Sequence, residues 1–512
     1  MFSRRHFLIA SGSAPLWAPG VSRGAPARYP FTLGVASGSP RETSVVLWTR
    51  LAPEPTKGGG MPAGAVAVRY RVCADPAMRR TVRDGLFVTS DADAHSVHVL
   101  VDGLEPGREY WYQFHLGEDD SPVGRTRTSS RKDAAARLAL ASCQNWQSGR
   151  YAAFADMAKW APDCVIHVGD YIYEGGVSPL GQYTRDVGGG RKKTFEVVRQ
   201  HDGPEIVTLW DYRNRYGLYK GDPDLQAAHA ASPWIVALDD HEVDNNWAGD
   251  TPQDPWAQTP LEFQVRKAAA FKAYWEHMPL ERPPAIAGVD AHLQLYGAYR
   301  FGPAQVCLLD TRQYRADQVC SDAFPRGPSC EALQDPARSM TGLAQEAWLL
   351  GELARSDATY NVLAQQTWFA PYRYNAPPAA PDINTDQWDG YPVQRQRLID
   401  AMAQTSNPIV LSGDWHCAAA MRIHRDPADA RSPRVGHEFA GTSISSDCPW
   451  ADSVHDAKDA NPHAAYVNGE RRGYVRCTAD ARTWTAEYRG VADPRDRASA
   501  VVTDAEFRTR DM

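Results

Sequence analysis

The sequence lacks three features, and the first two absences each exclude a class of protein. It has no run of 18 or more apolar residues, so we expect no integral membrane segment. Its net charge is -7, so no overall basic field exists to hold nucleic acid or an anionic membrane surface as a stable partner. No internal repeat is present either. With 43% hydrophobic and 23% charged residues over 512 positions, the composition predicts a globular chain, with two domains as the expectation.

A motif at the N-terminus predicts export. Arg4 and Arg5 precede a modest apolar run from Phe7, and small residues and prolines follow as far as Ala27. This order is typical of a twin-arginine secretion signal; a basic terminus that frays in solvent is the alternative. We therefore expect residues 1–26 to be a signal peptide for the twin-arginine export machinery. The mature protein would then work in the periplasm or outside the cell.

The cysteine count of nine is odd for an exported protein, so at least one thiol is left unpaired. Cys320 and Cys330 flank a Pro/Gly-rich loop that a disulfide could close in an oxidising compartment. Cys164 and Cys307 lie inside apolar runs and are expected to be core thiols. Cys143 is different, because it ends the apolar run "LALASC".

Two patterns divide the mature chain. Residues 27–130 contain short alternating strands, and the setting of Tyr110 resembles the tyrosine corner of fibronectin and immunoglobulin domains, so we expect a fibronectin/Ig-like β-sandwich. After a polar linker at residues 129–137, apolar strands alternate with amphipathic helices, which predicts a layered α/β domain over residues 131–512. The Gly-rich stretch 175–202 is expected to be a binding loop or disordered.

Four apolar runs of this second domain end in polar side chains of unusual type. The runs are "LALASC", "CVIHVGDYIYE", "WIVALDDHEVDNNW" and "NPIVLSGDWHC". At the carboxyl ends of strands in a layered α/β sheet, such side chains meet in one crevice. The residues expected there are Cys143, Asp170, Tyr173, Asp239, Asp240, His241, Asp414 and His416.

The mixture of side chains at these strand ends predicts a metal site. Clustered carboxylates raise one another's pKa, and a multivalent cation removes that repulsion. A thiolate beside a tyrosinate favours a hard, highly charged iron, which predicts that Cys143 is a ligand. The alternatives for Cys143 are a buried core thiol and a nucleophile that meets His241 or His416 in space. A single strand-end Asp is usually a turn or helix-cap residue, but four coincident strand ends are harder to explain in that way.

These blocks resemble the metallophosphoesterases, the calcineurin-like and purple acid phosphatase superfamily. That superfamily has D-x-H, G-D-x-x-Y, G-N-H-E and G-H-x-H at its strand ends. The corresponding segments here are "ASC", "GDYIY", "DDHE" and "GDWH". The substitutions, together with "FTLGVASGSPRETSVVLWTRL" and "LDTRQYR", are similar to the PhoD-type alkaline phosphatases and the related phospholipase D. The resemblance covers nearly all of the mature chain and implies an αββα catalytic domain behind the β-sandwich.

The resemblance also implies a ligand set for Fe³⁺ and Ca²⁺. Iron would be held by Cys143, Asp170, Tyr173 and His416. Asp170 would bridge to calcium, and Asp240 and Asp414 would complete the second site, with Asp239 as a further ligand. Asp240 and Asp414 replace Asn and His of the wider superfamily, which favours oxygen-only ligation and therefore Ca²⁺. Leu238 departs from the Trp expected before "DDHE", which bears on packing and not on the metals.

The activity expected from this resemblance is hydrolysis of phosphomonoesters, and of some phosphodiesters, with an alkaline optimum. Hydroxide generated at a dinuclear or larger iron/calcium site would attack phosphorus. His241 would stabilise the transition state or protonate the leaving oxygen, and Asn145 would donate a hydrogen bond to phosphate, a turn-forming role being the alternative for Asn145. Arg315 is among four arginines expected either to clamp phosphate or to form surface ion pairs, the others being Arg213, Arg215 and Arg312.

Two alternative functions follow from the same residues. A phospholipase D or another phosphodiesterase would use the same chemistry on a diester, with the 175–202 stretch and the C-terminal segment deciding whether two substituents fit. A non-catalytic, calcium-stabilised surface protein would bind a wall polymer or carbohydrate, but such a protein has no need of a Cys/Tyr/His metal set.

Overall fold

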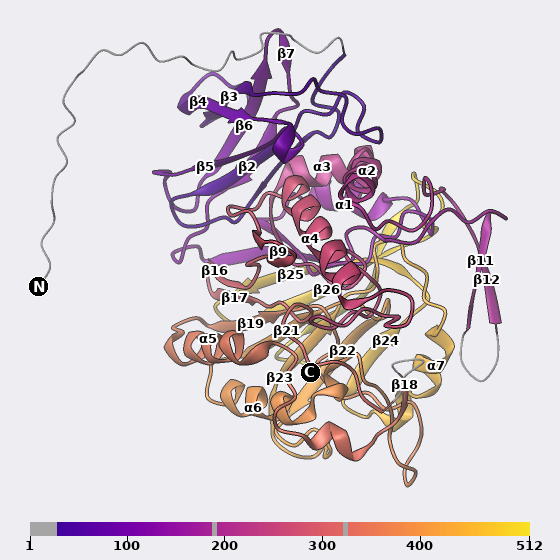
Figure 1. Cartoon of the computed structure of the whole chain (residues 1–512). Helices are drawn as coiled ribbons and strands as arrows, with labels where there is room; N and C mark the ends of the chain where they lie inside the picture. The colour runs from indigo at the N-terminus through magenta and orange to yellow at the C-terminus, as the bar shows by residue number, and fades with distance from the viewer. Residues whose placement is uncertain (1–27, 187–191, 321–325) are drawn as a thin grey trace, which may run out of the picture.

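The computed structural model describes residues 28–186, 192–320 and 326–512, and the predicted signal peptide of residues 1–26 lies outside this range. Two large β-sheets form the centre of the protein (Figure 1). One has nine strands, in the spatial order β27 (Val501–Arg508), β26 (Trp484–Val491), β25 (Arg472–Asp480), β9 (Ala135–Ala141), β10 (Cys164–His167), β13 (Pro233–Val236), β1 (Val35–Gly38), β2 (Val45–Arg50) and β5 (Ser96–Val101). The four strands from β9 to β1 pair in parallel.

The second sheet has seven strands and a parallel centre. Its order is β16 (Gly297–Phe301), β17 (Ala304–Leu308), β19 (Tyr360–Ala364), β21 (Pro408–Ser412), β23 (Arg434–Ala440), β22 (Ala418–His424) and β24 (Ala464–Asn468). Strands β17, β19, β21 and β23 run parallel. In both sheets, therefore, several strands end at the same edge.

Period-two alternation explains how the sheets stack. Leu138, Leu140 and Ile166 point from the first sheet toward Val362 and Leu411 of the second, in one buried cluster. The alternate side chains of the first sheet, such as those of Ala139 and Val165, pack against helices on the other face. Those helices are α1 (Ala152–Trp160), α2 (Leu209–Lys220), α3 (Pro223–Ala231) and α4 (Pro260–His277).

Helices also cover the outer face of the second sheet. Cys307, Leu363 and Val410 pack there against α5 (Gly342–Arg355) and α6 (Pro392–Met402). The part of the chain after the N-terminal strands is therefore an α/β structure of four layers, helix–sheet–sheet–helix (Figure 1). The remaining short elements are α7 (Ala451–Asp456), η1 (Asp91–Asp93), η2 (Glu331–Gln334), η3 (Trp388–Gly390) and η4 (Lys458–Ala460).

The N-terminal strands contribute to two sheets. A five-stranded sheet comprises β4 (Thr81–Thr89), β3 (Val66–Cys73), β6 (Glu109–Leu116), β7 (Asp119–Asp120) and β8 (Gly124–Arg127). It packs against β2 and β5 through one apolar cluster that includes Val68, Tyr112 and Val99. Tyr110 accepts a hydrogen bond at its hydroxyl from the backbone N–H of Glu105, at 2.9 Å. Because β1 pairs in parallel with β13, the sheet beneath this cluster continues into the four-layered part of the chain.

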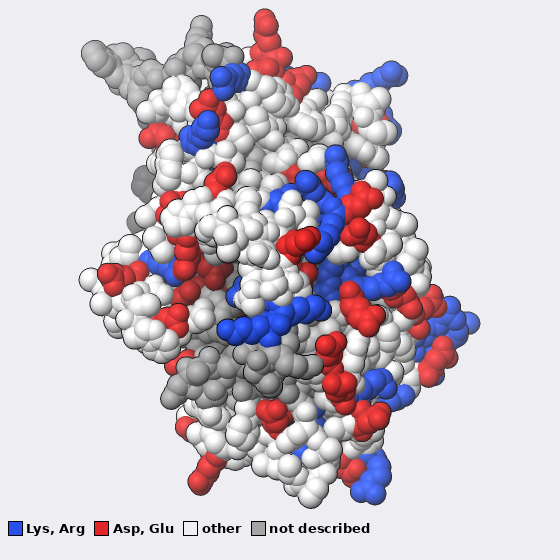
Figure 2. Space-filling view, turned by 90° about the vertical axis from the view of Figure 1, so that its right-hand side faces the viewer, with Lys and Arg blue, Asp and Glu red and all other residues white. Residues whose placement is uncertain are grey.

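Three two-stranded ribbons complete the sheets of the described residues. They are β11 (Gln182–Asp186) with β12 (Lys192–Glu196), β14 (Ala285–Ala287) with β15 (Asp290–His292), and β18 (Arg326–Pro328) with β20 (Asp382–Asn384). The β11–β12 hairpin lies within the predicted 175–202 stretch and projects from the molecule (Figure 1). On the face that carries it, acidic and basic side chains are interspersed, with Lys and Arg gathered near the middle (Figure 2).

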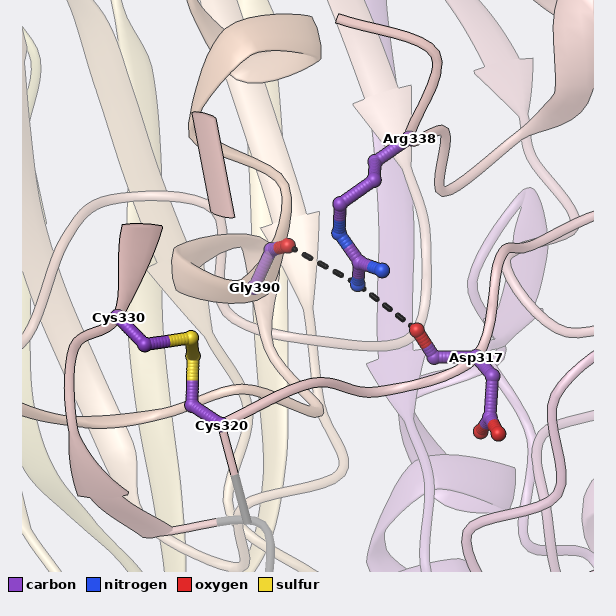
Figure 3. Close-up of a disulfide and its surroundings, with 5 residues drawn as sticks. All are labelled: Asp317, Cys320, Cys330, Arg338 and Gly390. Carbon is purple, nitrogen blue, oxygen red and sulfur yellow. Dashed lines mark hydrogen bonds between the residues drawn. A yellow bond between two sulfur atoms is a disulfide. The ribbon is translucent and has the colours of Figure 1, made fainter. Parts of the chain in front are cut away.

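A disulfide joins Cys320 to Cys330, as the Pro/Gly-rich loop between them indicated (Figure 3). Arg338 braces the same region by donating to the backbone oxygen of Asp317 at 2.8 Å. The thiols predicted to belong to the core, Cys164 and Cys307, are buried. Among the described residues, no helix has the length and apolar character needed to cross a membrane.

Candidate metal centre

Four strand ends converge between the two sheets. The segments after β9, β10 and β13 come from the first sheet, and the segment after β21 comes from the second. Their Cys, Asp and His side chains form three overlapping groups, in each of which the ligand atoms lie within 4.8 Å of one another. The groups are Cys143–Asp170–His416, Asp170–Asp240–His241 and Asp239–Asp240–Asp414. Asp170 and Asp240 each belong to two groups, so the three form one continuous site.

The backbone is strained at several of these positions. Cys143, Asp170, Asp414 and His416 have φ angles of 58°, 58°, 59° and 53°, in the left-handed region that non-glycine residues rarely adopt. Each such residue costs on the order of 1–3 kcal/mol and persists only where its surroundings enforce it. Gly169, at φ 109°, permits the close approach of two strand ends, because a Cβ atom there would lie 2.4 Å from that of Asp239.

The first group gathers sulfur, phenol, carboxylate and imidazole. The Tyr173 hydroxyl donates to Asp170 at 2.8 Å and lies 3.3 Å from Nε2 of His416. Nδ1 of His416 donates to the backbone oxygen of Asp447 at 2.6 Å, which leaves the Nε2 lone pair facing the site in the neutral imidazole. Burial, with the nearby Asp170 carboxylate, raises the pKa of the Cys143 thiol and of the Tyr173 phenol. A cation is therefore needed to hold either group deprotonated.

The second and third groups are rich in carboxylates, two of which have one oxygen without a hydrogen-bond partner. Oδ2 of Asp239 and Oδ1 of Asp240 are buried without a hydrogen bond. Burial and the neighbouring carboxylates raise the pKa of Asp414, and burial, opposed by Arg312, raises that of Asp239 to about 7. Unpartnered buried carboxylate oxygens are costly in an apolar interior, and a cation bound between them supplies the missing partner. The donor set therefore fits a metal centre.

Arg312 is a fixed cation beside these acids. Its guanidinium is fully buried, contacts Asp239 at 2.5 Å and forms two parallel bonds of 2.9 Å to Asp386. It also lies 3.8 Å from Asp240 and from Asp414. Because its donors are directed at protein carboxylates, Arg312 offsets part of the negative charge of the site and orients Asp239.

His241 is held from two sides. Its Nδ1 lies 2.7 Å from the Glu174 carboxylate, and its ring stacks on Tyr173 with centroids 4.1 Å apart. Although burial opposes it, the charge of Glu174, followed by those of Asp240 and Asp170, raises the pKa of His241 well above its ordinary value. In this arrangement the imidazolium is the favoured form, and it can donate a proton.

The two other predicted catalytic residues have protein partners. The Asn145 side-chain oxygen accepts from the backbone N–H of Gln147 at 2.8 Å, which is the bond of an Asx turn, and leaves its NH₂ group as a donor. Arg315 contacts Asp386 at 3.1 Å and donates to the Tyr391 hydroxyl at 3.0 Å. Contacts of Asn145 and Arg315 with phosphate stay predictions.

The remaining two arginines considered as clamps are also engaged. Arg213 forms an ion pair with Glu276 at 2.6 Å, and buried Arg215 donates to the backbone oxygens of Tyr173 and Gly175. Arg215 therefore braces the segment that carries Tyr173.

Several residues that hold the site together were missed in the sequence. Glu242 accepts from the backbone N–H groups of Asp170, Tyr171 and Asp239, at 3.1, 2.6 and 2.8 Å, and so joins two strand-end loops. Ser446 donates to the Tyr173 hydroxyl at 2.7 Å. Glu174 and Glu242 directly follow predicted site residues, and this adjacency is the signal that could have found them; Ser446, Asp447 and Asp386 carry no such signal.

Comparison with known proteins identifies relatives over nearly the whole chain. Residues 138–488 match the family model described as PhoD-like phosphatase, and residues 17–130 match that of its N-terminal domain. The chain is 44% identical over 488 residues to alkaline phosphatase D of Bacillus subtilis (strain 168), an alignment that covers 94% of this chain and 80% of that protein. A solved structure titled "Structure of PhoD" superposes with a TM-score of 0.87 at 42% identity, covering 96% of this chain and 91% of that one.

Proposed function

The chain belongs to the PhoD-like phosphatase family and is a phosphoric ester hydrolase, and on this basis we propose that it is an exported alkaline phosphatase that works with Fe³⁺ and Ca²⁺. The observation that carries the metal assignment is the overlap of the three ligand groups at Asp170 and Asp240. A thiol, a phenol and an imidazole at one end suit iron, and carboxylates alone at the other end suit calcium.

The residues divide between two proposed sites. Cys143, Asp170, Tyr173 and His416 hold Fe³⁺, and Asp170, Asp239, Asp240 and Asp414 face Ca²⁺. When bound, the metals supply positive charge to neutralise the phosphate oxygens and to activate water. Asp386 and Arg312 are not ligands in this assignment, because they pair with each other.

The proton that the leaving oxygen needs comes from His241. Its Nδ1 bond to Glu174 directs Nε2 away from that carboxylate, so a protonated Nε2 is free to donate. Stacking on Tyr173 prevents the imidazole from rotating out of the site. The free NH₂ group of Asn145 donates to a phosphate oxygen, and Arg315 adds positive charge from a position fixed by Asp386 and Tyr391.

The substrate proposed is a phosphomonoester, with phosphodiesters hydrolysed more slowly. The alternative is a phospholipase D or another phosphodiesterase, which would use the same site on a phosphodiester as its main substrate. Membership in a phosphatase family leaves a non-catalytic surface protein without support.

Export and domain layout complete the proposal. Arg4 and Arg5, with the apolar run after them, support a twin-arginine signal over residues 1–26 and a periplasmic or extracellular site of action. The Tyr110 hydrogen bond and the shared apolar cluster support a fibronectin/Ig-like β-sandwich over residues 27–130, followed by the catalytic domain over residues 131–512.

The test of this function is elemental analysis of the purified mature protein, combined with turnover of two substrates. We expect iron and calcium in stoichiometric amounts, and faster hydrolysis of p-nitrophenyl phosphate than of bis-p-nitrophenyl phosphate. Calcium without iron would contradict the assignment of Cys143 and Tyr173. Faster hydrolysis of the diester would favour the phosphodiesterase alternative.

A further inference from the structure

Two cysteines outside the proposed ligand set, Cys417 and Cys448, lie against each other, and Cys417 directly follows the proposed ligand His416. The Sγ atoms of Cys417 and Cys448 are 3.2 Å apart, although the two residues are separated by 31 positions. Non-bonded heavy atoms pack at about 3.5–4.0 Å, whereas a disulfide bond is about 2.05 Å long. The two thiols are therefore closer than ordinary neighbours, and a small movement brings them to bonding distance.

The surroundings suit an apolar crosslink. Both side chains belong to a buried cluster with Trp368, Trp415 and Met421. In the reduced form one thiol donates a weak S–H···S hydrogen bond to the other sulfur, and the disulfide replaces this contact with a covalent bond. Cys417 is 0% exposed and Cys448 is 7% exposed, so a reagent reaches Cys448 first.

We propose that Cys417 and Cys448 form a disulfide in the mature protein, as a redox modification site separate from the Cys320–Cys330 bond. Cys417 follows His416, and Cys448 follows Asp447, whose backbone oxygen accepts from Nδ1 of His416 at 2.6 Å. The crosslink therefore joins the two segments that this hydrogen bond already connects. Formation of this bond does not depend on the function proposed for His416.

Thiol–disulfide exchange with a small-molecule disulfide, such as oxidised glutathione, supplies the oxidant. The sulfur of Cys448 attacks one glutathione sulfur, the glutathione disulfide breaks, and the departing thiolate takes the Cys448 proton. The sulfur of Cys417 then attacks Cys448 Sγ and releases the second glutathione, which takes the Cys417 proton. Two cysteine thiols and one glutathione disulfide become one protein disulfide and two glutathione thiols.

Peptide mapping of the folded mature chain tests the proposal without any variant. The protein is incubated with oxidised glutathione, alkylated in denaturant and digested without reductant. We expect a linked peptide pair containing Cys417 and Cys448, with Cys320–Cys330 linked as the positive control. Cys164 and Cys477, which are buried, serve as alkylated controls. Alkylation of both Cys417 and Cys448, while Cys320–Cys330 stays linked, would overturn the proposal whatever the phosphatase activity.

A stability measurement gives a second, independent result. In the Cys320→Ser/Cys330→Ser background, reductant should lower the Tm of the oxidised protein by about 2–5 °C, because the bond limits the unfolded chain. Adding Cys417→Ala and Cys448→Ala should abolish that response. A reductant response of the same size in both proteins would contradict the crosslink; if the variants do not fold, the mapping result decides.

Discussion

The carboxylate of Glu174 lies 2.7 Å from Nδ1 of His241, and the second oxygen of the same carboxylate accepts from the backbone N–H of Asn245 at 3.1 Å. Both oxygens are therefore in use, and the carboxylate cannot turn away from the imidazole. This contact does two things to His241: it orients Nε2 toward the site, and it stabilises the charged ring. Glu174 is thus a positioning residue that sets how much of His241 is protonated.

Replacing Glu174 with Gln tests that role. Without the neighbouring charge the pKa of His241 falls, so the imidazolium is lost at a lower pH. We expect the alkaline limb of the kcat profile to move to lower pH, and kcat at alkaline pH to fall by about tenfold or more. Glu205→Gln, which removes the partner of Arg266 instead, is the matched control and should leave the profile in place. An unchanged alkaline limb in Glu174→Gln would exclude His241 as the proton donor.

Asp170 is the carboxylate common to the thiol-containing group and the His241 group. Asp170→Asn keeps the shape of the side chain but removes the negative charge of the one carboxylate proposed to contact both metals. Hydrolysis of p-nitrophenyl phosphate should fall by about 100- to 1,000-fold or more, with the circular dichroism spectrum unchanged. Asp222→Asn, which breaks a buried ion pair with Arg199, should cost stability and leave bound iron unaltered. Full turnover by Asp170→Asn would refute the site.

The sequence predicts those parts of the site whose residues are marked by their immediate sequence neighbours, and not those that depend on partners far away in the chain. The strand ends at Cys143, Asp170, Asp239 and Asp414 were recognisable, because an apolar run that stops at a chemically unusual residue is a local pattern. The parallel order of β9, β10 and β13 brings the first three ends together, whereas Asp414 joins them only because the second sheet stacks on the first. The role of Arg312 was not predictable, because its partner Asp386 lies 74 positions away and only the folded chain shows that they pair.

In the fold, too, local patterns predict single elements, whereas long-range contacts are not predictable. Alternation within single strands and helical spacing predict the elements, and apolar residues at helical spacing lie within α1, α4, α5 and α6. The polar linker expected at 129–137 instead includes the start of β9, because Ala135–Arg137 pair with β25. The pairing of β1 with β13 joins Ser37 to Pro233, and no local signal specifies such a long-range contact.

Two buried glutamates offer a matched pair for separating positioning from stability. Glu242 accepts backbone N–H groups of Asp170 and Tyr171, while Glu438 accepts those of Phe369 and Ala370. Changing either to Gln leaves a buried N–H facing an NH₂ group, which costs about 1–3 kcal/mol of unfolding free energy. In Glu242→Gln we expect kcat to fall as well, because Asp170 moves; in Glu438→Gln the loss of kcat should be much smaller. Equal losses of kcat would show that both act through stability alone.

Removing metal should destabilise the protein through its own carboxylates. Asp239, Asp240 and Asp414 lie within ligand distance of one another, and after a chelator removes the metal their repulsion is opposed only in part, by the Arg312 guanidinium and by the charge of His241 on Asp240. At metal concentrations about a hundredfold above Kd, bound metal contributes about 3 kcal/mol of unfolding free energy. We expect EDTA to lower the Tm, readdition of Fe³⁺ and Ca²⁺ to restore it, and Asp414→Asn to show a smaller shift. A Tm indifferent to EDTA at every metal loading would contradict a metal-stabilised site.

Lys220, at the end of α2, predicts a pH dependence that has no connection with the metals. Its ammonium nitrogen lies 4.2 Å from the centroid of the Trp48 ring and 3.5 Å from Nε2 of His229. Burial lowers its pKa from 10.5 to about 7. Below pH 10.5 the unfolded chain binds a proton that the folded chain does not bind until about pH 7, so unfolding becomes easier as the pH falls through this window.

Lys220→Met removes the titrating group and keeps the apolar stem. At pH 8 the folded chain holds Lys220 mostly neutral, so we expect the substitution to raise the unfolding free energy by roughly 1–3 kcal/mol and to flatten its slope between pH 7 and 10. Urea denaturation at several pH values measures both. Lys267→Met is the control: Lys267 pairs with Asp250, so its removal costs an ion pair and should not raise stability. If Lys220→Met destabilises the protein throughout this range, the Lys220 ammonium is solvated or paired in the native state. Its burial then costs no unfolding free energy.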